Sequence, residues 1–243
     1  MNSNKKFSLI NDFQKEIFGD VTFQENKQPK PIVIFCHGYK GFKDWGAWHL
    51  IAEAFAEAGF FFLKFNFSNN GVTSENPTEF DDLEAFGQDN FSKQLQDLNQ
   101  VINFFEDENE FSNEIDFSKL SLIGHSRGGG IAILQAYEDE RVKQIITWAG
   151  VSDFGNRFPK GNKLAQWKEE GVYYIVNGRT QQKMPHYIQF YEDFMANQKR
   201  FHIKTAVQNL AKPLLVIHGT HDETVNVQEA EILFDAAKNA KIK

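Results

Sequence analysis

The sequence contains one cysteine, Cys36, among its 243 residues. A single cysteine excludes an internal disulfide bond and leaves no pattern of paired cysteines for zinc. Cys36 lies within an apolar run, so a small buried side chain is a better interpretation of it than a nucleophile. No other residues form a metal-ligand pattern, and we expect neither a metal nor a cofactor.

Long hydrophobic runs are also missing. No segment approaches the roughly 18 apolar residues of a membrane-spanning helix. Residues 1–13 lack the apolar core of a signal peptide, which makes the cytoplasm the default expectation for location. The net charge is −7 and the basic residues are scattered, whereas binding to nucleic acid requires a face rich in Lys and Arg. We therefore expect neither membrane nor nucleic acid as a partner, and these features indicate no oligomeric state.

What the sequence does contain is an alternation of two hydrophobic patterns. Short apolar runs rich in β-branched or aromatic residues, typical of strands buried on both faces, lie at 31–35, 60–67, 119–124, 142–148 and 213–217. Apolar residues at helical spacing lie at 48–56, 85–106 and 227–239. This order predicts an α/β fold with a mostly parallel, doubly wound sheet, formed as a single domain over residues 1–243.

Three segments depart from the alternation. Residues 7–27 are interpreted as one or two short strands with a turn at Gly19–Asp20. Residues 151–207 are aromatic and polar, and we interpret them as a helical cap or lid inserted within the domain. At residues 241–243 one more strand would begin, so the last strand of the fold is expected to be missing.

The strongest chemical signal is the sequence Gly124-His125-Ser126-Arg127-Gly128, a G-x-S-x-G pattern between a strand and a helix. A strand that turns at once into a helix strains the serine backbone, and side chains two positions before and after it would collide. Glycine at both positions therefore fits a nucleophile elbow. The serine hydroxyl would then lie at a helix N-terminus, where the helix dipole favours the anion formed during attack.

A second signal is the loop His37-Gly38-Tyr39-Lys40-Gly41, which follows an earlier strand. Acyl transfer needs backbone N–H donors directed at the developing oxyanion. One donor would be Arg127, the residue after the nucleophile. We expect the other to be Tyr39, with Lys40 as the second choice, and His37 to brace the loop rather than act as a base.

The third signal is the segment 218–225, HGTHDETV, just after a late strand. An acid at this place fits the chain order Ser, then Asp, then His, and Asp222 would orient an imidazole and stabilise its charged form. A turn aspartate with only a local capping role is the simpler alternative. Asp153 is the alternative acid, and Glu223 is a weaker third.

Together the segments HGYKGFKDWG, FNFSNNG, GHSRGGG and HGTHDETV resemble the serine-esterase branch of the α/β-hydrolase superfamily, near dienelactone-hydrolase-like and acyl-esterase proteins. The likeness covers nearly the whole chain. It implies a Ser–Asp–His triad that hydrolyses an acyl ester or a related carbonyl compound without a cofactor. The cysteine nucleophile of the dienelactone hydrolases proper is not carried over, because position 126 is serine.

The sequence departs from this pattern at the base. In the family the histidine follows the acid, but no histidine follows Asp222 here. The candidates within the chain are His37, His49, His125, His186, His202, His218 and His221. We expect none of them to substitute, and we interpret the chain as truncated before the catalytic histidine, which would leave Ser126 a weak nucleophile.

The expected function is therefore hydrolysis of carboxylic esters of small molecules by a serine esterase. A peptidase or thioesterase shares the same chemistry, and a non-catalytic binding protein would explain the missing base. Aromatic residues of the cap either line a pocket or form the apolar face of a lid helix; these are Trp167, Tyr173, Tyr174, Tyr187, Phe190 and Tyr191. Basic residues that could contact an anionic substrate are Arg127, Arg157, Arg179 and Lys40, and for all but Arg127 solvated surface charge is the simpler interpretation.

Overall fold

The computed structural model describes residues 2–107, 109–238 and 240–242. The strands are β1 (Asn2–Ile10), β2 (Glu16–Gln24), β3 (Lys30–Cys36), β4 (Phe61–Phe65), β5 (Ile115–His125), β6 (Val142–Trp148), β7 (Val172–Val176), β8 (Lys183–Tyr187), β9 (Leu214–Ile217) and β10 (Ala240–Ile242). The α-helices are α1 (Trp48–Glu57), α2 (Leu83–Gly87), α3 (Phe91–Glu106), α4 (Arg127–Glu138), α5 (Asn162–Glu170), α6 (Gln189–Ala196), α7 (Ile203–Asn209) and α8 (Gln228–Ala236). Two short 3₁₀ helices span Ser112–Glu114 and Gly155–Arg157.

The main sheet has eight strands in the order β1-β2-β4-β3-β5-β6-β9-β10. The two N-terminal strands pair antiparallel, β1 with β2 and β2 with β4. From β4 onward every neighbouring pair is parallel. The predicted α/β fold with a mostly parallel sheet is confirmed.

Alternate residues of the central strands face two helical layers, as the pleat of a strand requires. Along β3, Ile32, Ile34 and Cys36 pack into the larger core with α3, α4, α7 and α8. Val33 and Phe35 pack on the other face, against Ala52 and the partly buried Trp48 of α1. Both faces of these strands are therefore buried, which explains their continuous apolar runs.

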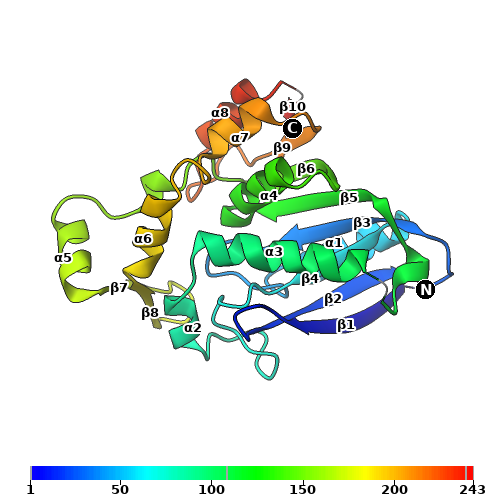
Figure 1. Ribbon diagram of the computed structural model, residues 1–243, viewed down its shortest axis with the longest axis horizontal. Coiled ribbons are helices and arrows are strands. Elements are labelled where there is room, and N and C mark those ends of the chain that lie inside the picture. The colour runs from blue at the N-terminus through cyan, green and yellow to red at the C-terminus, as the bar shows by residue number, and fades with distance from the viewer. Residues whose placement is uncertain (1, 108, 239, 243) are drawn as a thin grey trace.

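The cap extends beyond the end of the main sheet toward which the arrowheads of β3 and β5 point (Figure 1). It comprises α5, the β7–β8 hairpin and α6, whereas α7 contacts α4 and α8 in the main helical layer. The expected cap of residues 151–207 thus includes a helix that packs on the sheet side. Because the carboxyl ends of parallel strands meet at one edge, the loops after β3, β5 and β9 lie beneath the cap.

The expected turn at Gly19–Asp20 is wrong. Both residues lie inside β2, and the turn between β1 and β2 spans residues 11–15. A Cβ atom at Gly19 would lie 2.4 Å from the Phe7 ring, so glycine is required there by packing rather than by a turn.

The expected helix over 85–106 is interrupted. Residues 88–90 separate α2 from α3, and the side chain of Asn90 caps α3 by accepting a hydrogen bond from the Lys93 amide at 2.9 Å. Capping by an Asn side chain satisfies one of the free N–H groups of a first helical turn. The break places Asp89 just before α3, with its carboxylate 3.4 Å from Arg127.

Two further expectations need correction. The cap is not wholly helical, because β7 and β8 pair antiparallel through residues 172–187. The run Val-Tyr-Tyr-Ile-Val at 172–176 is a strand signal that polar surroundings obscured. The last strand is not missing either, since Ala240–Ile242 pairs parallel with Leu214–Val216 of β9.

Candidate active site

Ser126 lies at the turn between β5 and α4, in a backbone conformation of φ 53° and ψ −119°. Positive φ is costly for a residue with a side chain and persists only where surrounding structure imposes it. Here the Ser126 amide donates to the Trp148 carbonyl at 3.0 Å, and its carbonyl accepts from Gly129 at 3.0 Å and Val151 at 3.2 Å. These bonds hold the serine in the conformation that the strand-to-helix turn requires.

The glycines on either side of Ser126 allow close backbone approach. A Cβ at Gly124 would lie 2.2 Å from the Gly128 carbonyl oxygen, and one at Gly128 would lie 2.3 Å from the Cys36 carbonyl oxygen. Both distances are far below van der Waals contact. The two glycines of the motif are therefore required by the path of the backbone.

The loop after β3 lies directly beside the serine. A Cβ at Gly38 would come within 3.0 Å of the Ser126 Cβ, so this loop closes one side of the turn. Tyr39 of this loop and Arg127, which follows Ser126, both line the cavity beside the serine. The two residues predicted as oxyanion donors thus lie on either side of Ser126, and their role stays a prediction.

His37 braces this loop, as expected from its position. Its Nδ1 atom lies 2.9 Å from the Gly38 carbonyl, and Nε2 accepts from the Phe67 amide at 3.4 Å. Burial lowers the pKa of His37 to about 4, which keeps the ring neutral. His37 therefore serves the loop as an uncharged ring, which donates from Nδ1 to the Gly38 carbonyl and accepts at Nε2.

A ring of four charges, three of them buried, holds the same loop on the sheet and was missed by the sequence analysis. Asp20 of β2 accepts from Lys43 at 2.5 Å and from Lys64 at 2.7 Å, and both lysines also pair with Asp44. Lys43 and Asp44 belong to the loop, whereas Asp20 and Lys64 are paired across β2 and β4. The only sequence signal is a lysine inside an apolar strand, because buried charges are usually paired.

Asp222 lies in the loop after β9, as predicted. Its Oδ1 atom accepts from the amides of Thr224 at 2.8 Å and Val225 at 2.9 Å, and Oδ2 lies 3.9 Å from His218 Nε2. Partial burial alone would raise the pKa of Asp222, but these amide bonds outweigh it and lower the pKa. The carboxylate is therefore ionised at neutral pH.

The alternative acids are placed less favourably. Asp153 accepts from the Asn156 amide at 2.9 Å and lines a separate surface hollow with Phe194 and His202. Glu223 is exposed. Neither lines the cavity beside Ser126, whereas Thr224 and Val225 of the Asp222 loop do.

Ser126 opens into a cavity of about 560 Å³ beneath the cap. Its aromatic lining includes Trp167, Tyr173 and Phe190, three of the predicted cap aromatics. Of the others, Tyr174 is exposed, Tyr187 bonds Glu84 at the surface, and Tyr191 packs on Phe158. The volume and the apolar lining suit a small organic ligand.

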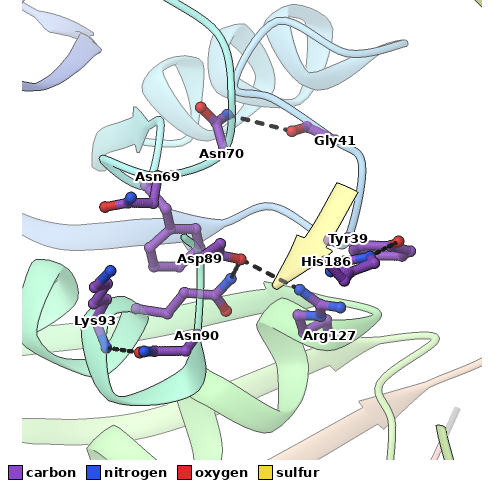
Figure 2. A network of polar contacts seen from close by, with 12 residues as sticks. Tyr39, Gly41, Asn69, Asn70, Asp89, Asn90, Lys93, Arg127 and His186 are labelled. Carbon is purple, nitrogen blue, oxygen red and sulfur yellow. Dashed lines mark hydrogen bonds and ion pairs between the residues drawn. The ribbon is translucent and has the colours of Figure 1, made fainter. Parts of the chain in front are cut away.

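A polar network that the sequence analysis missed lies at one end of the cavity (Figure 2). Tyr39 Oη lies 2.5 Å from His186 Nε2 of β8, which joins the cap to the loop after β3. Burial, with Arg127 and Lys40 nearby, lowers the pKa of His186 to about 3, so the ring is neutral. Asp89 lies 3.4 Å from Arg127 Nη1, and burial raises its pKa to about 7 despite that charge.

The seven histidines do not supply an evident base within the described part of the chain. Five direct a ring nitrogen to another residue, namely His37 to Gly38, His186 to Tyr39, His202 to Thr205, His218 to Val225 and His221 to Thr220. His125 packs on Trp48 with ring centroids 5.2 Å apart, and burial lowers its pKa. The seventh, His49, is exposed on α1. Nor do the described residues contain a His, Cys, Asp or Glu cluster that could bind a metal ion.

Over the same residues, every helix is too short or too polar to cross a bilayer. The predicted cytoplasmic location stays a prediction.

The sequence matches one family model and several curated proteins. The family model BD-FAE matches residues 20–236. An Escherichia coli protein described as an uncharacterized 31.7 kDa protein in the traX-finO intergenic region is 31% identical over 51% of this chain and 38% of its own length. An uncharacterized peptidase of Bacillus subtilis, YtmA, is 26% identical over 49% of this chain and 41% of its own. The matched regions thus cover less than half of these relatives.

Solved structures match over nearly the whole chain. The esterase domain of a Rhodothermus marinus protein superposes with a TM-score of 0.65 at 20% identity, covering 99% of this chain and 87% of its own. The α/β hydrolase GrgF of a Penicillium species has a TM-score of 0.70 at 16% identity, with coverages of 99% and 89%. For a Klebsiella pneumoniae putative dienelactone hydrolase the TM-score is 0.63 at 15% identity, with coverages of 100% and 85%. At such identities the likeness is one of fold.

Proposed function

The chain belongs to the BD-FAE family, and on that premise we propose that it is a serine hydrolase that cleaves carboxylic esters through an acyl-enzyme on Ser126. Its fold is that of α/β hydrolases. The observation that carries the proposal is the strained turn at Ser126, which opens into a cavity with aromatic walls beside the loop that bears Tyr39. A serine in this setting fits acyl transfer better than a structural role.

In the proposed reaction Ser126 Oγ attacks the ester carbonyl carbon and gives up its proton to a base. The amides of Tyr39 and Arg127 stabilise the oxyanion, since the loop after β3 that bears Tyr39 lies beside Ser126 and Arg127 follows it in the chain. The alcohol leaves with a proton from the base, and water then releases the acid from Ser126. Asp222 is the acid that would orient an imidazole, because its amide bonds keep it ionised.

The test is covalent labelling of the folded chain by a fluorophosphonate probe at neutral pH, with Ser126→Ala as control. Free imidazole is added in a parallel reaction to replace a missing base. Labelling without imidazole would identify a base among the chain's own histidines, and His125→Gln, His186→Gln and His218→Gln would locate it. Labelling only with imidazole would show that Ser126 is correctly placed to react but that the chain supplies no base. Absence of labelling in both reactions from a folded chain would contradict the proposal.

Peptide hydrolysis is a second candidate, because the relative from Bacillus subtilis is described as a peptidase. The two reactions differ in the leaving group, since an amine must be protonated to leave whereas 4-nitrophenolate leaves unaided. Matched 4-nitrophenyl esters and 4-nitroanilides of the same acyl group separate them. Cleavage of the anilides at a comparable rate would favour the peptidase.

A further inference from the structure

The cavity beside Ser126 is cationic, although the whole chain has a net charge of −7. Its lining includes the basic side chains of Lys40, Arg127, Arg157 and Lys163, and no Asp or Glu of the described residues is part of it. A concave surface with charges of one sign and apolar walls concentrates ligands of the opposite sign. The cavity therefore favours anions.

The four cations differ in how far protein carboxylates neutralise them. Arg157 donates to Glu229 at 2.7 Å, a normal distance for a charge-assisted hydrogen bond. Lys163 lies on the exposed surface of α5. Lys40 forms no ion pair with a carboxylate anywhere in the described ranges, and it is half-buried at the cavity. The excess charge thus lies near Lys40 and Arg127.

Arg127 is only weakly compensated. Its one carboxylate contact is Asp89 Oδ2 at 3.4 Å, longer than the about 2.7–2.9 Å of a strong charge-assisted bond. That oxygen also accepts from Gln94 Nε2 at 2.6 Å, and Asp89 Oδ1 has no partner within the described part of the chain. The partly buried guanidinium therefore keeps N–H donors that a second carboxylate could accept from.

The guanidinium is also rigidly placed. It lies over the Tyr39 ring, 4.1 Å from the ring centroid (Figure 2). The centroid of the Phe190 ring is 5.2 Å away, and Lys40 Nζ lies 5.3 Å from the Tyr39 centroid. The hydrogen bond from Tyr39 to His186 holds the ring that both cations contact. A guanidinium fixed by stacking loses little freedom when it binds a carboxylate.

We propose that Arg127, assisted by Lys40, binds a carboxylate that the ester substrate carries in addition to its scissile ester. The inference rests on the proposed function, because it names the substrate class of Ser126. The planar guanidinium presents paired N–H donors that match a carboxylate, and Trp167, Tyr173 and Phe190 cover the apolar body of the ligand. The substrate class is thus an aromatic or apolar ester with a free carboxylate.

The test compares two ligands of nearly equal shape, 4-acetoxybenzoate and its neutral amide 4-acetoxybenzamide. Their dissociation constants are measured by calorimetry on the Ser126→Ala chain, in which the ester survives. We expect the carboxylate to bind at least about tenfold more tightly, since a hydrogen bond between charged groups contributes this much. Arg127→Met should abolish the preference, and Lys40→Met should reduce it.

Arg157→Met is the matched control, because it removes the same charge from the same cavity where Glu229 already neutralises it. It should keep most of the preference. Asp89→Asn should instead increase the preference for the carboxylate ligand, because it removes the carboxylate that competes for Arg127. This variant tests the inference even if Arg127→Met does not fold. Equal affinity of the two ligands, or a preference that survives in Arg127→Met, would overturn the inference.

Failure of this inference and failure of the proposed function give different results. Labelling of Ser126 by the fluorophosphonate probe without any carboxylate preference overturns the anion site alone. A carboxylate preference that depends on Arg127, in a chain whose Ser126 is never labelled, overturns the hydrolase alone.

Discussion

The turn at Ser126 and the loop at Asp222 follow strands of the same sheet, β5 and β9, which are separated by β6. Around Ser126 backbone lies against backbone, and a Cβ at Gly124 or Gly128 would collide with carbonyl oxygens. Around Asp222 there is open space, with nothing within 4 Å of a Cβ at Gly219 and with His221, Glu223 and Thr224 exposed. One region is shaped by packing, the other by the hydrogen bonds of a single carboxylate.

The carboxylates of the two regions differ in burial and in the direction of their pKa shifts. Asp89, on the Arg127 side of the cavity, is buried, and that burial raises its pKa to about 7. Asp222 is partly exposed, and the amides of Val225 and Thr224 lower its pKa against the effect of burial. A residue that stays charged is suited to orienting a base, whereas one that titrates near neutrality is suited to adjusting the charge of its neighbour.

The largest effect should come from a methyl group added at the packed turn. We expect Gly128→Ala to lower the free energy of unfolding by about 3 kcal/mol or more, because the new Cβ would meet two backbone carbonyls that cannot move apart. Gly219→Ala is the matched control in open space and should change stability by less than about 0.5 kcal/mol. Urea unfolding measures both, and equal effects would break the comparison.

The next largest effect should be the contribution of Asp89 to the pH dependence of the free energy of unfolding. Its folded pKa lies above the usual 3.8, so the stability that depends on its protonated form is present below about pH 4 and lost as pH rises through about 7. Asp89→Asn removes this loss. Relative to the variant, the natural chain should lose on the order of 2 kcal/mol between pH 4 and 8. Unfolding curves at several pH values test this, and parallel profiles would contradict it.

Asp222 should have the smallest effect on stability. Asp222→Ala removes the acceptor for the Thr224 and Val225 amides and should cost about 1 kcal/mol, whereas Asp222→Asn keeps an oxygen in place and should cost a few tenths. Both variants should nevertheless slow the labelling of Ser126 by the fluorophosphonate probe. An Asn variant labelled as fast as the natural chain would remove Asp222 from the proposed reaction.

The turn at Ser126 could be predicted from the sequence because its requirements are local. Two glycines, a strand before and a helix after dictate the backbone within five residues. The requirement for Gly19 is not local, because the Phe7 ring that leaves no room for a Cβ there lies on another strand. The sequence therefore suggested a turn instead. A glycine alone does not reveal whether conformation or packing selected it.

The polar end of the cavity could not be predicted for a similar reason. Tyr39 and His186 are separated by 147 residues, and their contact depends on where the β7–β8 hairpin folds back. Asp89 appeared to be an ordinary residue of one long helix until the break before α3 placed it beside Arg127. Roles that arise from such distant contacts leave no periodic pattern in the sequence. By contrast, the hairpin itself had a local signal in its β-branched and aromatic run.

The single cysteine gains a practical use from its position. Cys36 is fully buried at the end of β3, its carbonyl lies against Gly128, and burial raises the pKa of its thiol. A buried, protonated thiol does not react with alkylating reagents, so reaction requires that the chain open at this point. The rate at which iodoacetamide modifies the untreated protein therefore reports how often the packed region around the Ser126 turn opens. The chain thus has its own probe of opening, with no label introduced.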